Sequence, residues 1–354
     1  RRTGKTFLLE KLIKDSLFKK EKIAFLKGDQ KIIKDVFSST NPQMMIDFIG
    51  KDTKMLVIDE AQKIENIGEN LKILIDEFPY LKIIASGSAS FELTSQLGEP
   101  LTGRKKTLLL YPISVSEIVN TKNQAYYQSI FEQHLIYGGY PEIFLKSSIK
   151  EKKEYLKNLV DDYLFRDILM LEQIKNSKKL RDLLSLLAFQ IGKEVSLNEL
   201  GNNLDLHKDT VARYLDLMKK SFIIFNIRGF SRNLRKEIYK TSRWYFYDNG
   251  IRNALINNFN PINLRNDVGE LWENYIITER LKKQQYQEIF SNNYFWRTYD
   301  QKEIDWIEER EGKIFGYEIK WQLKNKKPPR IFLETYPNST FQIINKTNFF
   351  SFIA

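Results

Sequence analysis

Short apolar runs alternate with amphipathic stretches over the first third of the chain. Four of these runs are rich in Ile, Leu or Val and have polar or glycine neighbours, which predicts β-strands. They cover residues 23–27, 55–58, 81–86 and 107–110. Between the runs, apolar residues recur at helical spacing, as Leu8, Leu9, Leu12 and Ile13 do. Strands that alternate with helices indicate a mostly parallel sheet covered by helices, so we expect an α/β domain over residues 1–120.

The pattern changes after this first domain. Helical spacing continues over residues 121–177 and predicts a helical lid or linker, interrupted by a turn at 137–141. Residues 178–255 predict short helices with tight breaks between them, followed by a basic segment. The last region, 256–354, begins with a helix and continues as strands joined by polar turns. We therefore expect four consecutive regions rather than one repeated unit.

The chain begins Arg-Arg-Thr-Gly-Lys-Thr and runs into an amphipathic helix, which is the second half of the phosphate-binding motif G-x-x-x-x-G-K-[ST]. Gly4 permits a close turn, and backbone amides from Thr3 onward would point at the β-phosphate. Lys5 would supply positive charge to the β- and γ-phosphates, and the Thr6 hydroxyl would ligate Mg²⁺. The first glycine of the motif would lie two positions before Arg1, so we expect the chain to begin inside the motif.

A partner motif occurs at residues 55–60, Met-Leu-Val-Ile-Asp-Glu. An apolar strand there would deliver Asp59 to the Mg²⁺ ion, and Glu60 would polarise the attacking water. The alternative is that both carboxylates simply cap the following helix. The spacing and the strand context favour the metal and water roles, so we predict a P-loop ATPase that uses ATP and Mg²⁺.

Two further positions extend this predicted site. The strand that begins at residue 81 ends in Ser86-Gly87-Ser88, where Ser88 or Ser86 could sense the γ-phosphate; a simple turn is the alternative. Arg104 follows a glycine in a polar loop and could reach a phosphate in cis or from a neighbouring subunit. An arginine that reaches a neighbouring subunit would imply a homo-oligomer. The alternative is that Arg104 is an ordinary surface residue.

Together these segments resemble the prokaryotic AAA+-type ATPases that carry a C-terminal domain of unknown function, the AAA_14/DUF4143 architecture. Besides the first motif, the resemblance rests on Leu-Val-Ile-Asp-Glu-Ala-Gln at 56–62, Ile-Ala-Ser-Gly-Ser at 84–88, Leu-x-Gly-Arg at 101–104, Tyr-Pro-Ile-Ser at 111–114, Gly-Gly-Tyr-Pro-Glu at 138–142 and Tyr-Leu-Phe-Arg-Asp-Ile at 163–168. It extends over nearly the whole chain. It implies a fold and an ATP site more than a biological role.

The region 178–255 contains a helix–turn–helix pattern of the winged-helix kind, with helices expected over 196–204 and 209–218. Basic residues lie in or beside the second helix and where a wing would follow: Lys208, Arg213, Arg232 and Arg235. Such a surface would contact DNA phosphates, and few side chains are suited to reading bases. The alternative is a winged helix that only docks one domain on another.

In the last region Asp305 lies on a predicted strand, and after a polar turn the next strand carries Glu318 and Lys320 on one face. This arrangement resembles the PD-(D/E)xK nuclease core. The two carboxylates could share Mg²⁺ while Lys320 positions or deprotonates a water molecule. Glu273, on the preceding helix, matches the additional acidic residue of such folds. A degenerate site and an ion-pair cluster at a sheet edge are the alternatives.

Charge and cysteine content narrow the class of protein. The chain has 56 Lys and Arg against 45 Asp and Glu, a net charge of +11, which favours an anionic partner such as DNA as much as a Lys-rich solvated surface. The absence of cysteine excludes disulfides and thiolate metal sites and fits the cytoplasm. No apolar run reaches the roughly 18 residues that a membrane helix needs.

These features lead to one functional hypothesis and one rival. The first is a Mg²⁺-dependent ATPase that acts on or binds DNA through its winged-helix and nuclease-like regions. The rival is a nucleotide-controlled switch or protein-interaction module whose nuclease-like region is catalytically silent.

Overall fold

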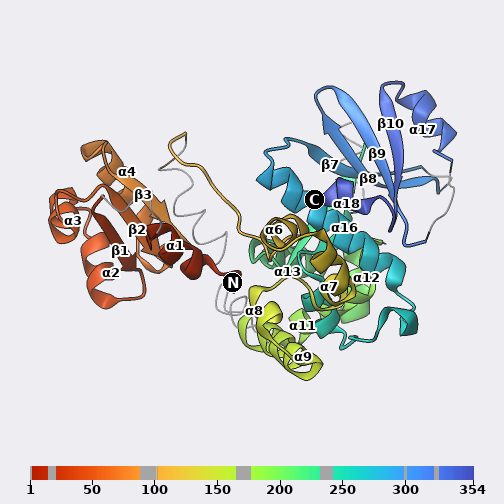
Figure 1. Ribbon diagram of the computed structural model, residues 1–354, viewed down its shortest axis with the longest axis horizontal. Coiled ribbons are helices and arrows are strands. Elements are labelled where there is room, and N and C mark those ends of the chain that lie inside the picture. The colour runs from red at the N-terminus through yellow and green to blue at the C-terminus, as the bar shows by residue number, and fades with distance from the viewer. Residues whose placement is uncertain are drawn as a thin grey trace. The chain divides into compact units, whose positions relative to one another are not determined.

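The computed structural model describes residues 2–14, 21–87, 101, 103–164, 177–231, 242–298, 301–322 and 327–354. The chain forms two compact units, drawn in Figure 1. The N-terminal unit comprises Arg1–Leu110 with Lys220–Phe222, and the C-terminal unit comprises Tyr111–Lys219 and Ile223–Ala354. Three of the predicted site residues, Ser88, Arg232 and Arg235, lie outside the described residues.

The N-terminal unit contains a three-stranded parallel sheet in the order β1-β2-β3, which confirms the predicted parallel sheet. Its strands are β1 (Ile23–Lys27), β2 (Met55–Asp59) and β3 (Lys82–Ala85). All five residues of the central strand β2 are buried. A continuous apolar run is typical of a parallel strand that is covered on both faces.

Side chains of β2 alternate between two cores. Leu56 and Ile58 pack against the helices α2 to α4, whereas Met55 and Val57 pack with Leu9 of α1. The helices of this unit are α1 (Lys5–Lys14), α2 (Lys31–Phe37), α3 (Pro42–Ile49), the short 3-10 helix η2 (Ala61–Lys63) and α4 (Ile67–Glu77). The sheet is therefore covered from both sides, as the alternating pattern predicted.

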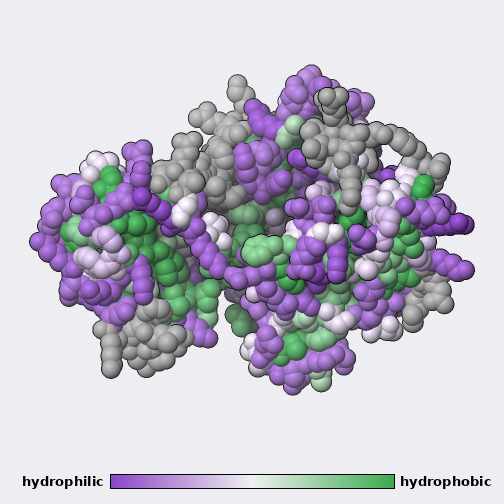
Figure 2. Space-filling view, turned by 90° about the horizontal axis from the view of Figure 1, so that it is seen from above, coloured by the Kyte–Doolittle hydropathy of each residue, from purple (hydrophilic) through white to green (hydrophobic). Residues whose placement is uncertain are grey.

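The strand predicted at residues 107–110 was wrong. These residues form no strand with any part of the chain that the structure describes, and Leu108 is 76% exposed. Leu8, one of the residues at helical spacing, is 52% exposed, since α1 contacts the sheet through Leu9 and Ile13. Phe7 is also exposed, and hydrophobic residues reach the surface of this unit in Figure 2.

The C-terminal unit contains a seven-stranded mixed sheet in the order β10-β9-β8-β7-β5-β6-β4. Its strands are β4 (Glu194–Val195), β5 (Ile224–Gly229), β6 (Ser242–Phe246), β7 (Asn292–Arg297), β8 (Glu303–Arg310), β9 (Lys313–Ile319) and β10 (Ser339–Ile344). The β5 and β7 strands pair in parallel at Arg228 and Tyr294, whereas β7, β8 and β9 are antiparallel. One sheet thus joins strands from the two regions expected over 178–255 and 256–354.

The helices of this unit fall into three groups along the chain. The first group is α6 (Val115–Thr121), α7 (Gln124–Tyr137), α8 (Pro141–Leu145), α9 (Ile149–Asn158) and the π-helical η3 (Leu159–Leu164). The second is α11 (Ser177–Phe189), α12 (Leu197–Leu204), α13 (Lys208–Lys220) and α15 (Asn249–Leu255). The third is η4 (Ile262–Leu264), α16 (Val268–Tyr286), α17 (Arg330–Thr335) and α18 (Phe349–Ile353). None of the described helices is long and apolar enough to span a bilayer.

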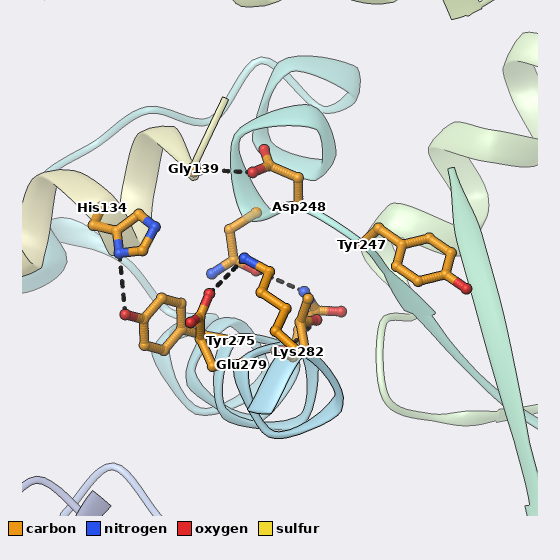
Figure 3. A pocket seen from close by; sticks show the side chains of 11 residues that line it. His134, Gly139, Tyr247, Asp248, Tyr275, Glu279 and Lys282 are labelled. Carbon is orange, nitrogen blue, oxygen red and sulfur yellow. Dashed lines mark hydrogen bonds and ion pairs between the residues drawn. The ribbon is translucent and has the colours of Figure 1, made fainter. Parts of the chain in front are cut away.

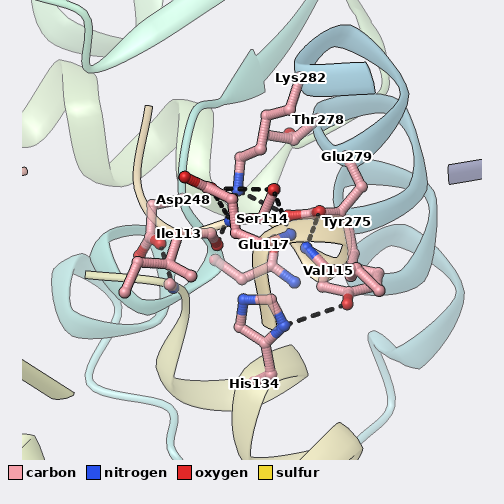
Figure 4. Close-up of polar contacts among 12 residues, drawn as sticks. Ile113, Ser114, Val115, Glu117, His134, Asp248, Tyr275, Thr278, Glu279 and Lys282 are labelled. Carbon is pink, nitrogen blue, oxygen red and sulfur yellow. Dashed lines mark hydrogen bonds and ion pairs between the residues drawn. The ribbon is translucent and has the colours of Figure 1, made fainter. Parts of the chain in front are cut away.

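Buried polar contacts tie the turn at 111–114 to α16 and the turn at 138–142 to Asp248, the N-cap residue of α15. The backbone amide of Val115 donates to Glu279 at 2.8 Å, and Lys282 pairs with the same carboxylate at 2.6 Å (Figure 4). Asp248 accepts a hydrogen bond from the Gly139 amide at 2.7 Å (Figure 3). The cavity among these residues measures about 10 Å³, room for one water molecule at most. These two motifs of the sequence therefore hold helices together.

His134 of α7 belongs to the same network and gives a pH-dependent prediction. It is 3% exposed and contacts the Tyr275 hydroxyl at 3.2 Å (Figure 3). Burial, with a smaller contribution from the charge of Lys282, lowers the pKa of His134 to about 3. Because this folded-state pKa lies below the unfolded value, the unfolded chain binds the extra proton first. The stabilisation is thus complete above about pH 6.5 and is lost as the pH falls.

We therefore expect the difference in unfolding free energy between the wild type and His134→Gln to change by about 1.4 kcal/mol per pH unit between about pH 6 and 4. The wild type loses the stability, because glutamine does not titrate. Urea unfolding at several pH values measures the difference. His207→Gln is the matched control, since that side chain is 73% exposed. Parallel stability profiles for the wild type and His134→Gln would contradict a buried, neutral His134.

Candidate ATP site and a second acidic cleft

The two halves of the predicted phosphate site meet in the N-terminal unit. Thr6 lies in the first turn of α1, and Asp59 is the last residue of β2. The Thr6 hydroxyl donates to an Asp59 carboxylate oxygen at 2.6 Å, across 53 positions of sequence. The structure therefore brings together the residues that the sequence predicted as Mg²⁺ ligands.

The segment before α1 has the backbone of an anion-binding turn. Gly4 has a φ of 90°, in the left-handed region that favours glycine, and the helix begins at Lys5. The Leu8 amide donates to the Gly4 carbonyl at 2.9 Å, so the amides of Thr3 to Thr6 are not used within the helix. No acidic residue lies in the first turn of α1. A helix N-terminus of this kind carries a partial positive charge, which favours a bound anion.

Ser86 follows β3 and is the second residue whose hydroxyl contacts the Asp59 carboxylate. Its hydroxyl donates to the second Asp59 carboxylate oxygen, and its amide donates to the Ile58 carbonyl at 2.9 Å. The Ser86 carbonyl accepts from the Ala61 amide at 2.8 Å. Of the two serines that the sequence proposed, Ser86 therefore contacts the Asp59 carboxylate, whereas Ser88 lies outside the described residues.

Glu60 has an unusual backbone conformation for a non-glycine residue, with a φ of 56°. The side-chain amide of Gln62 donates to a Glu60 carboxylate oxygen at 2.8 Å. Gly28, at the end of β1, comes so close that an added Cβ would lie 2.5 Å from the Glu60 carbonyl oxygen. The sequence analysis did not predict the contact of Gln62 with Glu60. The only available signal was that Gln62 follows Glu60 by two residues.

Arg104 lies elsewhere in the same unit. Its guanidinium pairs with Asp76 of α4, and both side chains are about half exposed. The structure therefore places Arg104 in a surface ion pair rather than beside Asp59.

A second cleft, of about 480 Å³, opens in the C-terminal unit and is lined by residues of six elements, among them α16, β6 and β8. Glu273 comes from α16, Arg243 from β6 and Glu303 from β8, while Lys320 follows β9 directly. Beneath them lie Asp305 and Glu318, which are 2% and 0% exposed. The structure thus brings together all four residues of the predicted nuclease site.

Ion pairs connect the charged groups of this cleft. The Lys320 ammonium lies 2.8 Å from Glu318 and 3.3 Å from Asp305. Burial opposes the charge of this lysine, but the two carboxylates hold the pKa of Lys320 above its usual value. The Tyr245 hydroxyl donates to Glu273 at 2.7 Å. Burial and then the negative charge of Asp305 raise the pKa of Glu273 to about 8.

Arg243 is the functional candidate in this cleft that the sequence analysis missed. Its guanidinium lies 2.6 Å from Glu303, 3.5 Å from Asp305 and 3.9 Å from Glu273. The sequence signal for a functional role was a single arginine within the otherwise mostly aromatic run Ser-Arg-Trp-Tyr-Phe. In the structure four of these five residues are buried. Among the described residues, no group of three or more acidic or histidine side chains has an arrangement that could hold a metal ion.

The two helices expected over 196–218 are present as α12 and α13. Val211, Leu215 and Met218 of α13 are buried. Lys208, at the start of the helix, and Arg213 are exposed.

Family models match three parts of the chain. They are an AAA domain, AAA_14, over residues 1–119, a domain of unknown function, DUF8612, over 128–262, and a second domain of unknown function, DUF4143, over 268–349. The first and third are the pair that the sequence motifs resembled, which confirms that prediction. DUF8612 was not foreseen.

The chain is also similar to several uncharacterized proteins. MJ1544 of Methanocaldococcus jannaschii is 26% identical over 89% of this chain and 70% of its own length. Rv2008c of Mycobacterium tuberculosis is 25% identical over 75% of this chain and 58% of its own length. A protein of Haemophilus influenzae is 23% identical over 75% of this chain and 66% of its own. The chain thus spans 58% to 70% of the length of these relatives.

Proposed function

The chain combines an AAA domain with a C-terminal DUF4143 domain, and we propose from this architecture that its N-terminal unit binds ATP with Mg²⁺ and hydrolyses it. The observation that carries the proposal is the 2.6 Å contact between Thr6 and Asp59. It joins a helix N-terminus suited to phosphate with a buried carboxylate at the end of a central strand. Neither half alone would distinguish this site from an ordinary turn or helix cap.

The residues of the site fit Mg²⁺, because a hydroxyl and a carboxylate offer the oxygen ligands that this ion prefers. Thr6 and Asp59 would hold the ion, and bound Mg²⁺ would neutralise charge on the phosphate oxygens. Ser86 keeps the Asp59 carboxylate oriented through its hydroxyl. The backbone amides before α1 and the Lys5 ammonium would bind the β- and γ-phosphates.

Water activation is assigned to Glu60. Its carboxylate would accept a proton from the water that attacks the γ-phosphorus. The hydrogen bond from Gln62 fixes one of its oxygens and leaves the other to accept that proton. We assign Gln62 a positioning role, because it contacts Glu60 rather than the phosphate site.

We further propose that α12 and α13 belong to a winged helix that contacts duplex DNA. The support is a helix–turn–helix followed by the antiparallel pair β5 and β6, with β4 beside β6. Lys208, Arg213 and Lys219 are exposed on α13 and would contact phosphates. Asp209 and Asp216 share the exposed surface, so we expect modest affinity with little sequence preference.

Binding of a labelled duplex over a salt series, with and without ATP, tests this proposal. The double variant Lys208→Ala/Arg213→Ala should weaken binding and lower the slope of log affinity against log salt by about one for each phosphate that the variant can no longer neutralise. Arg330→Ala is the matched control, because that side chain is 91% exposed on α17, away from α13 in sequence and fold. Wild-type protein that shows no salt-dependent binding would remove DNA from the account.

A second candidate function is a nucleotide-controlled interaction module whose nuclease-like cleft is silent. One observation favours it, since Arg243 and Lys320 already pair with the carboxylates of that cleft. ATP turnover without DNA binding or DNA cleavage would support this second candidate.

A further inference from the structure

The carboxylates of the C-terminal cleft are already engaged by groups of the chain itself. One oxygen of Asp305 accepts from the Ile319 amide at 2.8 Å and lies 3.3 Å from the Lys320 ammonium. The other lies 3.5 Å from the Arg243 guanidinium. Lys320 also pairs with Glu318 at 2.8 Å. Both oxygens of the expected central ligand therefore face a positive group.

Arg243 is held firmly in this position. It lies in β6 between two partner strands, opposite Ile227 of β5 and Glu194 of β4. Its side chain is 5% exposed, and its guanidinium stacks 4.7 Å from the centre of the Phe295 ring. The backbone pairing of β6 with β4 and β5, together with the Phe295 ring, leaves the Arg243 side chain little freedom to move away from Asp305. A buried charge of this kind is stable only with close partners, and Asp305 is one of them.

A divalent ion does not fit beside these groups. Magnesium and manganese need several oxygen ligands at short range, including carboxylate oxygens that are free to turn toward the ion. Here the buried Arg243 and the partly exposed Lys320 already pair with the two buried carboxylates, Asp305 and Glu318. A further double charge within a few ångströms of Arg243 and Lys320 would be repelled strongly in this buried setting. The predicted Mg²⁺ shared by Asp305 and Glu318 thus disagrees with the geometry.

We propose that Arg243 is a built-in counter-cation that occupies the metal position at Asp305 and excludes divalent metal from the C-terminal cleft. The cleft then keeps the acidic and basic residues of a nuclease-like site, but a guanidinium supplied by β6 offsets the negative charge at Asp305. The inference does not depend on ATP hydrolysis, because every contact behind it lies within the C-terminal unit.

Binding of Mn²⁺ alone to nucleotide-free, full-length protein, followed by electron paramagnetic resonance, tests the proposal. All proteins carry Asp59→Asn, so that the proposed ATP site adds no ion. We expect Arg243→Gln to bind Mn²⁺ at least about tenfold more tightly than the protein with Arg243, and to lose this site when Asp305→Asn is added. Arg243→Lys, which keeps the charge, should exclude Mn²⁺ as arginine does.

Arg297→Gln is the matched control, since Arg297 lines the same cleft but pairs with Glu194 at 2.8 Å. It should create no Mn²⁺ site. A folded Arg243→Gln protein that gains no site would overturn the proposal. Should Arg243→Gln fail to fold, Mn²⁺ binding by the protein that keeps Arg243, measured with and without Asp305→Asn, still tests the proposal. Mn²⁺ binding that Asp305→Asn abolishes would overturn the proposal, and equal Mn²⁺ binding with and without Asp305→Asn would support it.

Discussion

Replacing Glu60 with glutamine is expected to slow ATP hydrolysis by about a hundredfold to ten-thousandfold while ATP binding remains close to that of the wild type. Glutamine has nearly the same size and can keep a contact with Gln62, but it cannot accept a proton from water. Glu60 lies next to Asp59 without taking part in the Thr6 contact, so the phosphate and metal ligands remain in place. The loss should therefore fall on kcat rather than on KM.

Phosphate release at saturating ATP measures kcat, and a fluorescent ATP analogue measures binding. Glu65→Gln is the matched control, because Glu65 is exposed a few residues further along the same loop. Turnover at the wild-type rate in Glu60→Gln would show that another group activates the water. Loss of ATP binding in this variant would instead give Glu60 a structural role.

Replacing Lys5 with alanine is expected to lower kcat/KM for ATP by at least about a hundredfold and to weaken ATP binding as well. Lys5 is the first residue of α1, next to Gly4 and beside the Thr6–Asp59 contact. A positive charge there would face the β- and γ-phosphates both before and during reaction. Its removal therefore affects KM and kcat together, unlike the loss of Glu60.

Lys11→Ala is the matched control for this prediction, since Lys11 is exposed two turns further along α1. Both variants should unfold at the temperature of the wild type, because neither side chain belongs to the core. Unchanged turnover in Lys5→Ala would remove the phosphate-binding role of this segment, whatever the effect of Glu60→Gln.

The N-terminal unit could be predicted well because its signals are local. A buried parallel strand has a continuous apolar sequence, and the carboxyl end of this run marks where Asp59 lies. The first turn of α1 is equally plain from Gly-Lys-Thr. Two such short signals suffice to predict that Thr6 and Asp59 meet, although 53 positions separate them.

Other features depend on pairings that no local pattern reveals. The run at 107–110 has strand-like composition but pairs with no strand among the described residues, and Leu108 stays exposed. Whether a strand forms depends on neighbours as much as on its own residues. Gln62 was missed for a related reason, since its contact with Glu60 follows from the turn at η2 rather than from residue type.

Arg243 shows the same limit in the C-terminal cleft. The spacing of Asp305, Glu318 and Lys320 predicted that these three would gather, and they do. The sequence could not predict that β6 would join the same sheet and bring a guanidinium to Asp305. Because the metal prediction rested on the spacing of the carboxylates, their strand context and the resemblance to a nuclease core, it left out the cation that the fold supplies.

The most direct test of the central claim is phosphate release from ATP by the full-length wild-type protein over a Mg²⁺ series. The claim is that the segment before α1 and the end of β2 form one ATP site through Thr6 and Asp59. It predicts turnover that saturates with ATP, requires Mg²⁺ and stops when the metal is chelated. Absence of ATP turnover at every Mg²⁺ concentration, with the protein folded, would contradict it.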